Sequence, residues 1–383
     1  MKTLMKLLFL ILITFFSVQS YSQKPEPVYS FVRVLNDQNW YEQQAKLWKQ
    51  KIDKNSNDKM AWVNFYKANR AIIRYFNIDI KKDPESYLMP LDEIIKKAEK
   101  AIPNSFELYY LEAYDKGSYT EKGSEYLLKA QQLRPFDKLI LSDLMNYYQF
   151  QNDKANIELV STKWFESNEM PQEILITAYN NLVSLDANAI LLVNGDNDTY
   201  PYWILQNVQK IRPDVLILNV SLSLIDPYRE KIFKENSISQ LTLKNDSDRN
   251  SKTIVKFIFE NVSDRPVYVS VFVDQDIYKN YIDRMYLTGL SFKYSDKTFD
   301  NLAILQNNFE NKFMLDFLKQ SFYYNYAQSA VNQMNSGYLA IFLKLYEHYL
   351  LCGETVKAQN IKELAKTVSE DAGNNVWMKY FEK

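Results

Sequence analysis

Residues 188–220 read NAILLVNGDNDTYPYWILQNVQKIRPDVLILNV, a strand–helix–strand pattern. Ala189–Asn194 and Asp214–Val220 are short apolar runs, which are typical of strands buried on both faces of a sheet. Between them, Thr199–Ile211 places its large apolar side chains on one face of a helix. A connection of this length crosses over the sheet, so the two strands are predicted to be parallel, with a right-handed crossover.

The alternation of strands and helices continues and predicts a small, mostly parallel α/β sheet domain over residues 186–298. Alternating valines indicate a strand at Pro266–Val273. The other expected elements are helices at Pro227–Lys234 and Thr253–Val262, a weak strand at Gln240–Leu243, and a last strand at Met285–Tyr294 in which Gly289 marks a bulge.

A helical repeat domain is predicted to precede the sheet, over residues 23–185. Apolar residues recur there at helical spacing, and three units end at a proline: Pro103, Pro135 and Pro171. These prolines are 32 and 36 residues apart, which brackets the roughly 34-residue tetratricopeptide period. Because proline ends a helix, we expect tetratricopeptide-like helical hairpins.

C-terminal helical hairpins are predicted over residues 299–383, from helical patterns at Leu302–Met334 and Tyr338–Val368. The second pattern splits at Cys352-Gly353-Glu354. The predicted fold class is therefore α plus α/β, with tetratricopeptide-like helical hairpins flanking the small sheet domain.

The N-terminus has the pattern of a secretory signal peptide over residues 1–22. A basic start precedes an apolar stretch at Leu7–Phe16, and small residues precede a cleavage site near Ser22/Gln23. The alternative is an uncleaved anchor, although the apolar stretch is shorter than the roughly 20 residues of a spanning helix. We expect a periplasmic or secreted protein with no transmembrane span after cleavage.

Composition argues against several classes of function. The 383 residues carry 46 basic and 47 acidic side chains, so nucleic acid is not expected as a partner. One Cys and one His cannot build a structural zinc site, and they argue against histidine-based catalysis. The seven glycines are isolated, so neither of the common phosphate-binding loops is present.

The candidate site is an acidic motif, NGDNDTYP at residues 194–201. It follows the first strand, at the edge of the sheet where ligands bind in open α/β folds. Carboxylate and amide oxygens at this spacing can hold a divalent cation or hydrogen-bond a polyol. The predicted ligand-binding residues are Asp196, Asn197, Asp198, Thr199, Asn219, Asp226 and Asp274, with Asp196 and Asp198 as metal ligands.

A structural role for this motif is the alternative. Asp198 or Thr199 would then cap the following helix, and Asp196 would stabilise the turn and the positive end of that helix. No catalytic residue is assigned. No cofactor is expected, except that a divalent cation could bind at Asp196 and Asp198.

The motif and the residues that follow it resemble a stretch of the protein O-mannosyltransferase-like membrane protein family of Bacteroidota. Trp203, Asp214 and Asn219 follow the motif in the family's order, with Tyr200 in place of a Phe. Similar stretches downstream extend the resemblance over roughly residues 183–383. It implies an exported α/β-plus-repeat tail in the cell envelope. The family's glycosyl-transfer chemistry is implied for a multi-span membrane part that is not expected in this chain.

Two functions from different classes remain as expectations. The favoured one is an exported binding or scaffold protein that engages an envelope protein or glycan, because helical repeats form concave binding surfaces. The alternative is a carbohydrate-acting enzyme or a glycosyl-transfer accessory with its acidic site at Asp196 and Asp198. Dependence on a metal ion would favour the enzyme.

Overall fold

A computed structural model describes residues 24–78, 88–373 and 375–381. The predicted signal peptide lies outside the described residues. Contacts divide the chain into two compact units. The first unit comprises residues up to Val28 together with Asn36–Pro103, and the second comprises Tyr29–Leu35 together with Asn104–Lys383. This division does not test the predicted boundaries at residues 185 and 298, which stay predictions.

The first unit contains α2 (Gln38–Lys54), α3 (Lys59–Arg74) and α4 (Leu91–Ala101). Asp37 and Asp58 start α2 and α3, because each carboxylate accepts a hydrogen bond from a backbone N–H in the first turn. The two helices pack against each other through side chains such as Tyr41, Trp48 and Phe65, all buried. This is a helical hairpin of the predicted kind.

The second unit opens with five further helices. They are α5 (Phe106–Lys116), α6 (Glu121–Leu133), α7 (Leu141–Gln151), α8 (Lys154–Glu166) and α9 (Gln172–Ser184). Helices α5 and α6 pair with each other, as do α7 and α8. Asn152 ends α7 in the left-handed conformation, with φ 54°, and Asp153 caps α8 directly after it. The predicted helical hairpins are confirmed.

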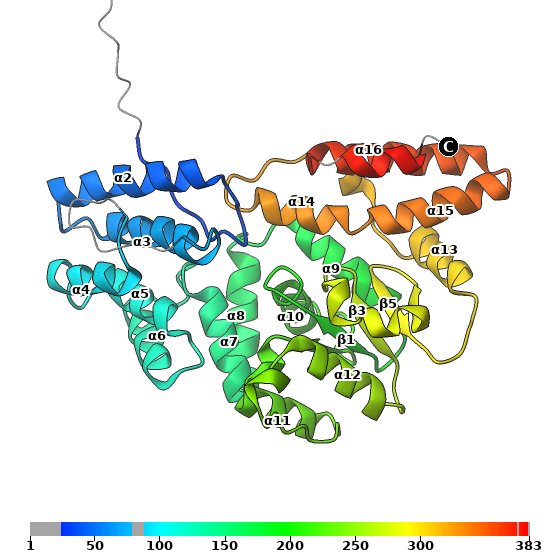
Figure 1. The fold of residues 1–383 in the computed structure, drawn as a ribbon, viewed down its shortest axis with the longest axis horizontal. Helices are drawn as coiled ribbons and strands as arrows, with labels where there is room; N and C mark the ends of the chain where they lie inside the picture. Colours follow the sequence, from blue (N-terminus) through cyan, green and yellow to red (C-terminus); the bar gives the residue numbers. More distant parts are fainter. Residues whose placement is uncertain (1–23, 79–87, 374, 382–383) are drawn as a thin grey trace, which may run out of the picture. The chain divides into compact units, whose positions relative to one another are not determined.

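A five-stranded mixed sheet forms the centre of the second unit (Figure 1). Its strands are β1 (Ile190–Val193), β2 (Leu216–Asn219), β3 (Val267–Ser270), β4 (Met285–Leu287) and β5 (Ser291–Tyr294), in the order β2-β1-β3-β5-β4. Strands β2, β1 and β3 are parallel, whereas β5 and β4 run antiparallel to their neighbours. The predicted parallel β1–β2 pair is confirmed, with α10 (Tyr200–Val208) as its crossover helix.

One face of the sheet is covered by α11 (Asp226–Glu235) and α12 (Ser251–Asn261), which both lie below it in Figure 1. Apolar side chains of these helices, including Phe233 and Ile258, form one cluster with Ile190, Leu218 and Val269 of the strands. All five of these side chains are fully buried. Burial of this apolar surface stabilises the sheet domain.

Two strand predictions are wrong. Residues 240–243 form no strand, because this segment continues the loop that follows α11. Residues 285–294 form a hairpin, β4 and β5, instead of a single strand with a bulge. Gly289 lies in its turn, where a Cβ would meet Ser184 Oγ at 2.8 Å. The glycine therefore marks a close approach to α9.

The chain ends in α13 (Asn301–Asn311), α14 (Gln328–Ser336), α15 (Leu339–Leu351) and α16 (Thr355–Asp371). The helical pattern predicted at residues 302–334 is interrupted. The side chain of Asn180 accepts a hydrogen bond from the N–H of Met314 and donates one to its C=O. In a continuous helix these two backbone groups would bond within the helix. Helices α15 and α16 form the predicted hairpin, with Gly353 in the turn at φ 74°.

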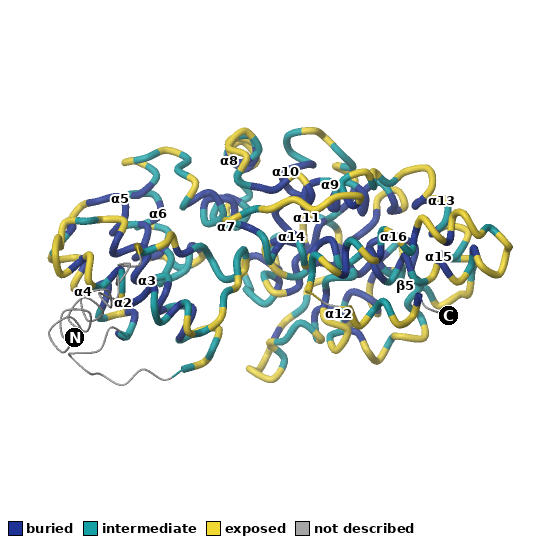
Figure 2. The backbone as a smooth tube through the Cα atoms, turned by 90° about the horizontal axis from the view of Figure 1, so that it is seen from above, coloured by how far each residue is buried: buried dark blue, intermediate teal, exposed yellow. Residues whose placement is uncertain are grey.

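Helix α9 is buried on several sides, including its polar residues Thr177, Asn180 and Asn181 (Figure 2). Each of these side chains has a hydrogen-bond partner, as buried polar groups require.

Within the part of the chain that the structure describes, no helix combines the length and the apolar character that crossing a bilayer demands.

Candidate functional site

The acidic motif lies in the loop between β1 and α10. Gly195 turns the chain with φ 84°, a conformation that favours glycine. The hydroxyl of Thr199 donates to the C=O of Gly195 at 2.7 Å and closes the loop. Helix α10 then begins at Tyr200, with Pro201 in its first turn. Neither Asp198 nor Thr199 caps the helix with its side chain.

Asp198 is buried beneath this loop, with 2% of its surface exposed. Its carboxyl group accepts from Ser270 Oγ at 2.8 Å, from Tyr202 Oη at 3.3 Å and from the backbone N–H of Asn194 at 3.2 Å. Burial raises the pKa of Asp198 to about 8, because loss of hydration outweighs these three hydrogen bonds. The side chain therefore ties the loop to the end of β3.

Thr199 and Asn219 join the ends of β1 and β2. Asn219 Nδ2 donates to Thr199 Oγ1 at 2.8 Å, and its oxygen accepts from the N–H groups of Ser221 and Leu222. Ser221 Oγ in turn donates to Asn194 Oδ1 at 2.6 Å. Thr199 and Asn219, two of the predicted ligand-binding residues, thus meet at the carboxyl edge of the sheet, where their polar side chains bind each other.

The segment Tyr29–Leu35, which belongs to the second unit, lies against the same loop. Asn197 Nδ2 donates to the C=O of Val32 at 2.9 Å, and Arg33 Nη1 donates to the C=O of Glu169 at 3.1 Å. Burial lowers the pKa of Arg33, and the nearby Asp196 and Glu169 carboxylates oppose this shift. Sequence reasoning missed Arg33, because no local pattern signals a contact over more than 130 residues.

Asp226 and Asp274 make separate contacts. Asp226 forms ion pairs with Arg229 at 2.5 Å and Arg249 at 2.6 Å, which lower the pKa of its carboxyl group to about 2. Asp274 accepts from the N–H of Asp276 at 2.9 Å. Neither carboxylate shares a hydrogen bond with the motif. Over the described ranges, no group of three or more His, Cys, Asp or Glu side chains is placed to hold a metal ion; the divalent cation stays a prediction.

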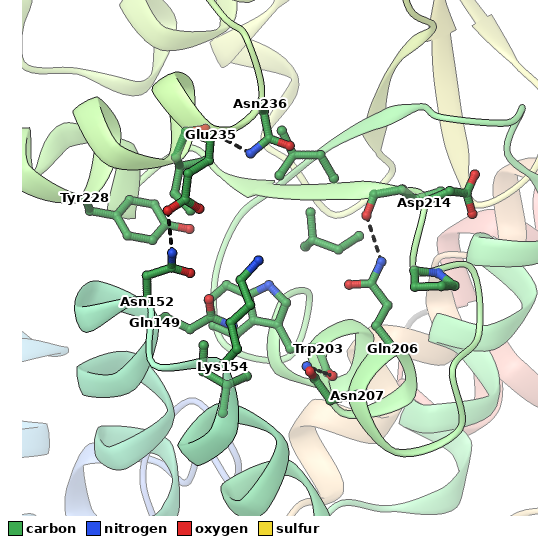
Figure 3. A pocket seen from close by; sticks show the side chains of 16 residues that line it. Gln149, Asn152, Lys154, Trp203, Gln206, Asn207, Asp214, Tyr228, Glu235 and Asn236 are labelled. Carbon is green, nitrogen blue, oxygen red and sulfur yellow. Dashed lines mark hydrogen bonds between the residues drawn. The ribbon is translucent and has the colours of Figure 1, made fainter.

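A second candidate site is a polar cleft at the free edge of β2 (Figure 3). It has a volume of about 260 Å³ and lies between the end of α7, the start of α8, α10, β2 and α11. Trp203 and Tyr228 supply aromatic rings, and Gln206, Asn207 and Asn236 supply amide groups. The sequence analysis did not find this cleft. Its local signal is the Gln206-Asn207 pair, which is polar within an otherwise apolar helix.

The cleft contains a hydroxyl group that has no hydrogen-bond partner among the described residues. Tyr228 is 1% exposed, and burial raises the pKa of its phenol with no hydrogen bond to oppose the shift. Figure 3 shows this hydroxyl pointing into the cleft. The hydroxyl is therefore free to form a hydrogen bond with a ligand in the cleft.

Four amide groups of the cleft donate to other protein groups, and only Gln206 uses both of its N–H donors in this way. Gln206 Nε2 donates to the C=O of Val215 at 2.7 Å, Asn207 Nδ2 to Trp203 at 2.7 Å, and Asn236 Nδ2 to Ile232 at 2.9 Å. Asn152 Nδ2 donates to the Glu235 carboxylate. The four amide oxygens are thereby left as acceptors, and Figure 3 shows those of Asn152 and Gln206 turned toward the space between them.

Charges of both signs surround the cleft. Lys154 is exposed and forms no ion pair within the described residues. Asp214 is paired with Arg212 through two contacts of 2.8 Å, and these hydrogen bonds hold the pKa of Asp214 well below its usual range. Glu235 supplies a second carboxylate. Such a cleft has no single charge preference.

Comparison with known proteins gives one partial match. Residues 174–240 match the family model described as TMEM260-associated domain 2. TMEM260 is an O-mannosyltransferase-like family, so the match agrees in part with the sequence resemblance. No curated protein matches the chain. The matched residues run from α9 to α11 and include both the acidic motif and most of the residues that line the cleft.

Proposed function

We propose that this chain is an exported binding protein of the cell envelope, and that its α/β unit holds part of a protein or glycan partner in the polar cleft. The proposal is supported chiefly by the Tyr228 hydroxyl, which points into the cleft and forms no hydrogen bond with the described residues. Export is supported by the signal-peptide pattern of residues 1–22, and membership of an envelope pathway by the resemblance to O-mannosyltransferase-like proteins.

The positions of the two carboxylates in the acidic motif favour binding over catalysis. A carboxylate pair that acts on a glycosidic bond must face the substrate from two sides. Asp198 instead lies buried among Ser270, Tyr202 and the Asn194 backbone, and Asp196 lies on the exposed side of the loop near Arg33. The cleft, in contrast, is open and has unused donors and acceptors.

The test is a crosslinked capture of partners from the cell envelope. The mature chain, the variant Tyr228→Phe/Asn236→Ala and the control Tyr278→Phe are compared. Tyr278 is a fair control because it is also buried and is outside the cleft. We expect wild type and control to recover the same defined partner and the cleft variant to recover much less. Equal recovery by all three, or no defined partner, would contradict the proposal.

A further inference from the structure

We infer that the polar cleft takes one neutral sugar ring, a pyranose unit that is free or at the end of a glycan. This inference rests on the proposed function, and it selects a glycan instead of a protein as the occupant of the cleft. A pyranose presents hydroxyl groups around its rim, and each can donate one hydrogen bond and accept others. It also presents an apolar face of C–H groups. The cleft matches each of these properties.

The first match is between the hydrogen-bonding groups of the cleft and those of a pyranose. The oxygens of Asn152, Gln206, Asn207 and Asn236 can only accept, and each of these amides already donates at least one N–H to the protein. The Tyr228 hydroxyl, with no partner, can donate or accept. A ligand that satisfies this set must donate several hydrogen bonds and accept at least one. A ring of hydroxyl groups does so, whereas a carboxylate or a phosphate ester offers mainly acceptors.

The second match is in size and shape. At about 260 Å³, the cleft is smaller than the roughly 300–1,000 Å³ of sites for drug-sized ligands. One sugar ring is of this order. Trp203 and Tyr228 are only 5% and 1% exposed, so apolar surface for the C–H face of a pyranose comes mainly from aliphatic lining residues such as Pro213 and Ile232.

The third match is in charge. Lys154 stands on the same cleft as Asp214 and Glu235. Asp214 is already paired with Arg212, so an anionic ligand would meet the carboxylate of Glu235 and a cationic ligand the ammonium group of Lys154. Because burial of a charge without a compensating partner is costly, a neutral ligand fits this lining better than either ion.

An extended peptide fits the cleft less well. Strand addition needs a run of free backbone groups along a sheet edge. Where β2 lines the cleft, the described residues leave the N–H and C=O of Ile217 unbonded, since the residues on either side of Ile217 bond to β1. The C=O of Val215 is bound by Gln206, and that of Asn219 by Ser223 Oγ. One open residue is too short for strand pairing, yet it can bind a hydroxyl.

The experiment is a titration of the whole mature chain, labelled with ¹⁵N-tryptophan, with the methyl pyranosides of glucose, galactose and mannose at millimolar concentrations. The indole signal of Trp203 is identified by its loss in Trp203→Phe. We expect at least one pyranoside to shift this signal saturably. Tyr228→Phe should weaken that binding about three- to tenfold, as loss of one neutral hydrogen bond predicts, and Tyr278→Phe should leave it unchanged.

Failure of the sugar inference can be told from failure of the proposed function. If no pyranoside shifts Trp203 but partner capture still depends on Tyr228, the inference is overturned and the proposed function stands. A peptide from the captured partner that shifts Trp203 would then identify the occupant as protein. If neither sugar binding nor capture responds to Tyr228→Phe, both proposals are wrong. A pyranoside that binds equally well to wild type and to Tyr228→Phe also overturns the inference.

Discussion

The hydroxyl of Ser270 donates to the buried Oδ1 of Asp198 at 2.8 Å, across 72 residues of sequence. This bond joins the end of β3 to the loop that follows β1, two neighbouring parallel strands. It gives the acidic motif a structural role. The Asp198 carboxyl group, which was predicted to bind a ligand, instead holds the edge of the sheet together. The open cleft lies at the free edge of β2.

The first prediction concerns the pH dependence of stability. The pKa of Asp198 rises from 3.8 in the unfolded chain to about 8 in the folded chain, so the folded state binds the proton more tightly. Its contribution to stability is complete below about pH 4 and is lost as the pH rises to about 8. Asp198→Asn, which resembles the neutral acid, should remove this slope of up to about 1.4 kcal/mol per pH unit.

Urea denaturation of wild type and Asp198→Asn at several pH values between 4 and 8 measures this effect. Asp186→Asn is a suitable control, because the effect of burial on the pKa of that carboxyl group is outweighed by hydrogen bonds from Lys293 and Tyr268, which lower it. We expect the gap between wild type and Asp198→Asn to shift in favour of the variant as the pH rises. Parallel stability curves for the two proteins would show that Asp198 is ionised in the folded state.

The second prediction concerns Arg33. Arg33→Met keeps an apolar side chain but removes the hydrogen bond to Glu169 and the charge near Asp196. Because the Glu169 carbonyl then loses a partner, we expect a loss of about 1–3 kcal/mol in the free energy of unfolding. Arg74→Met, at an exposed helix end, is the control. Cleavage by a protease within residues 29–35 should become faster only in Arg33→Met; unchanged cleavage and stability would contradict a structural role for this segment.

The third prediction compares two buried tyrosines. Tyr338 Oη accepts from Asn180 Nδ2 at 2.8 Å, whereas Tyr228 Oη forms no hydrogen bond in the part of the chain that the structure describes. Tyr338→Phe should therefore lower the free energy of unfolding by about 1 kcal/mol, and Tyr228→Phe should change it by much less. Thermal unfolding of both variants decides this. A large loss in Tyr228→Phe would mean that its hydroxyl serves the fold, and the argument for a binding role would fall.

The fourth prediction concerns Gly289. A Cβ at this position would come within 2.8 Å of Ser184 Oγ and 3.1 Å of its Cβ. Gly289→Ala should cost about 1–3 kcal/mol of stability, the usual range for overpacking. The double variant Gly289→Ala/Ser184→Gly should recover most of that loss in a double-mutant cycle. Additive effects of the two substitutions would show that the contact is not the cause.

Much of the fold follows from local sequence patterns. The β1–α10–β2 unit was predictable because apolar runs and a one-sided helix each leave a periodic signal. The hairpin of β4 and β5 was not, because its turn at Thr288-Gly289-Leu290 has no strong turn pair and its glycine serves a contact with Ser184. The break after α13 depends on Asn180, 134 residues away, and no local pattern can indicate it.

The candidate site was predictable only in part. The position of the acidic motif at the carboxyl edge of the sheet follows from the order of strand and helix, as does its proximity to Asn219. The burial of Asp198 depends on Ser270 and Tyr202, and the cleft depends on how α7, α8 and α11 meet the edge of β2. These are tertiary contacts between side chains that carry no shared spacing in the sequence.

The most direct test of the binding site is hydrogen exchange of the mature chain with and without its captured envelope partner. We predict slower exchange at residues 203–217, which include the open Ile217 N–H, and at residues 228–236, with little change at residues 194–199. Protection confined to residues 194–199 would contradict the account and return the binding site to the acidic motif.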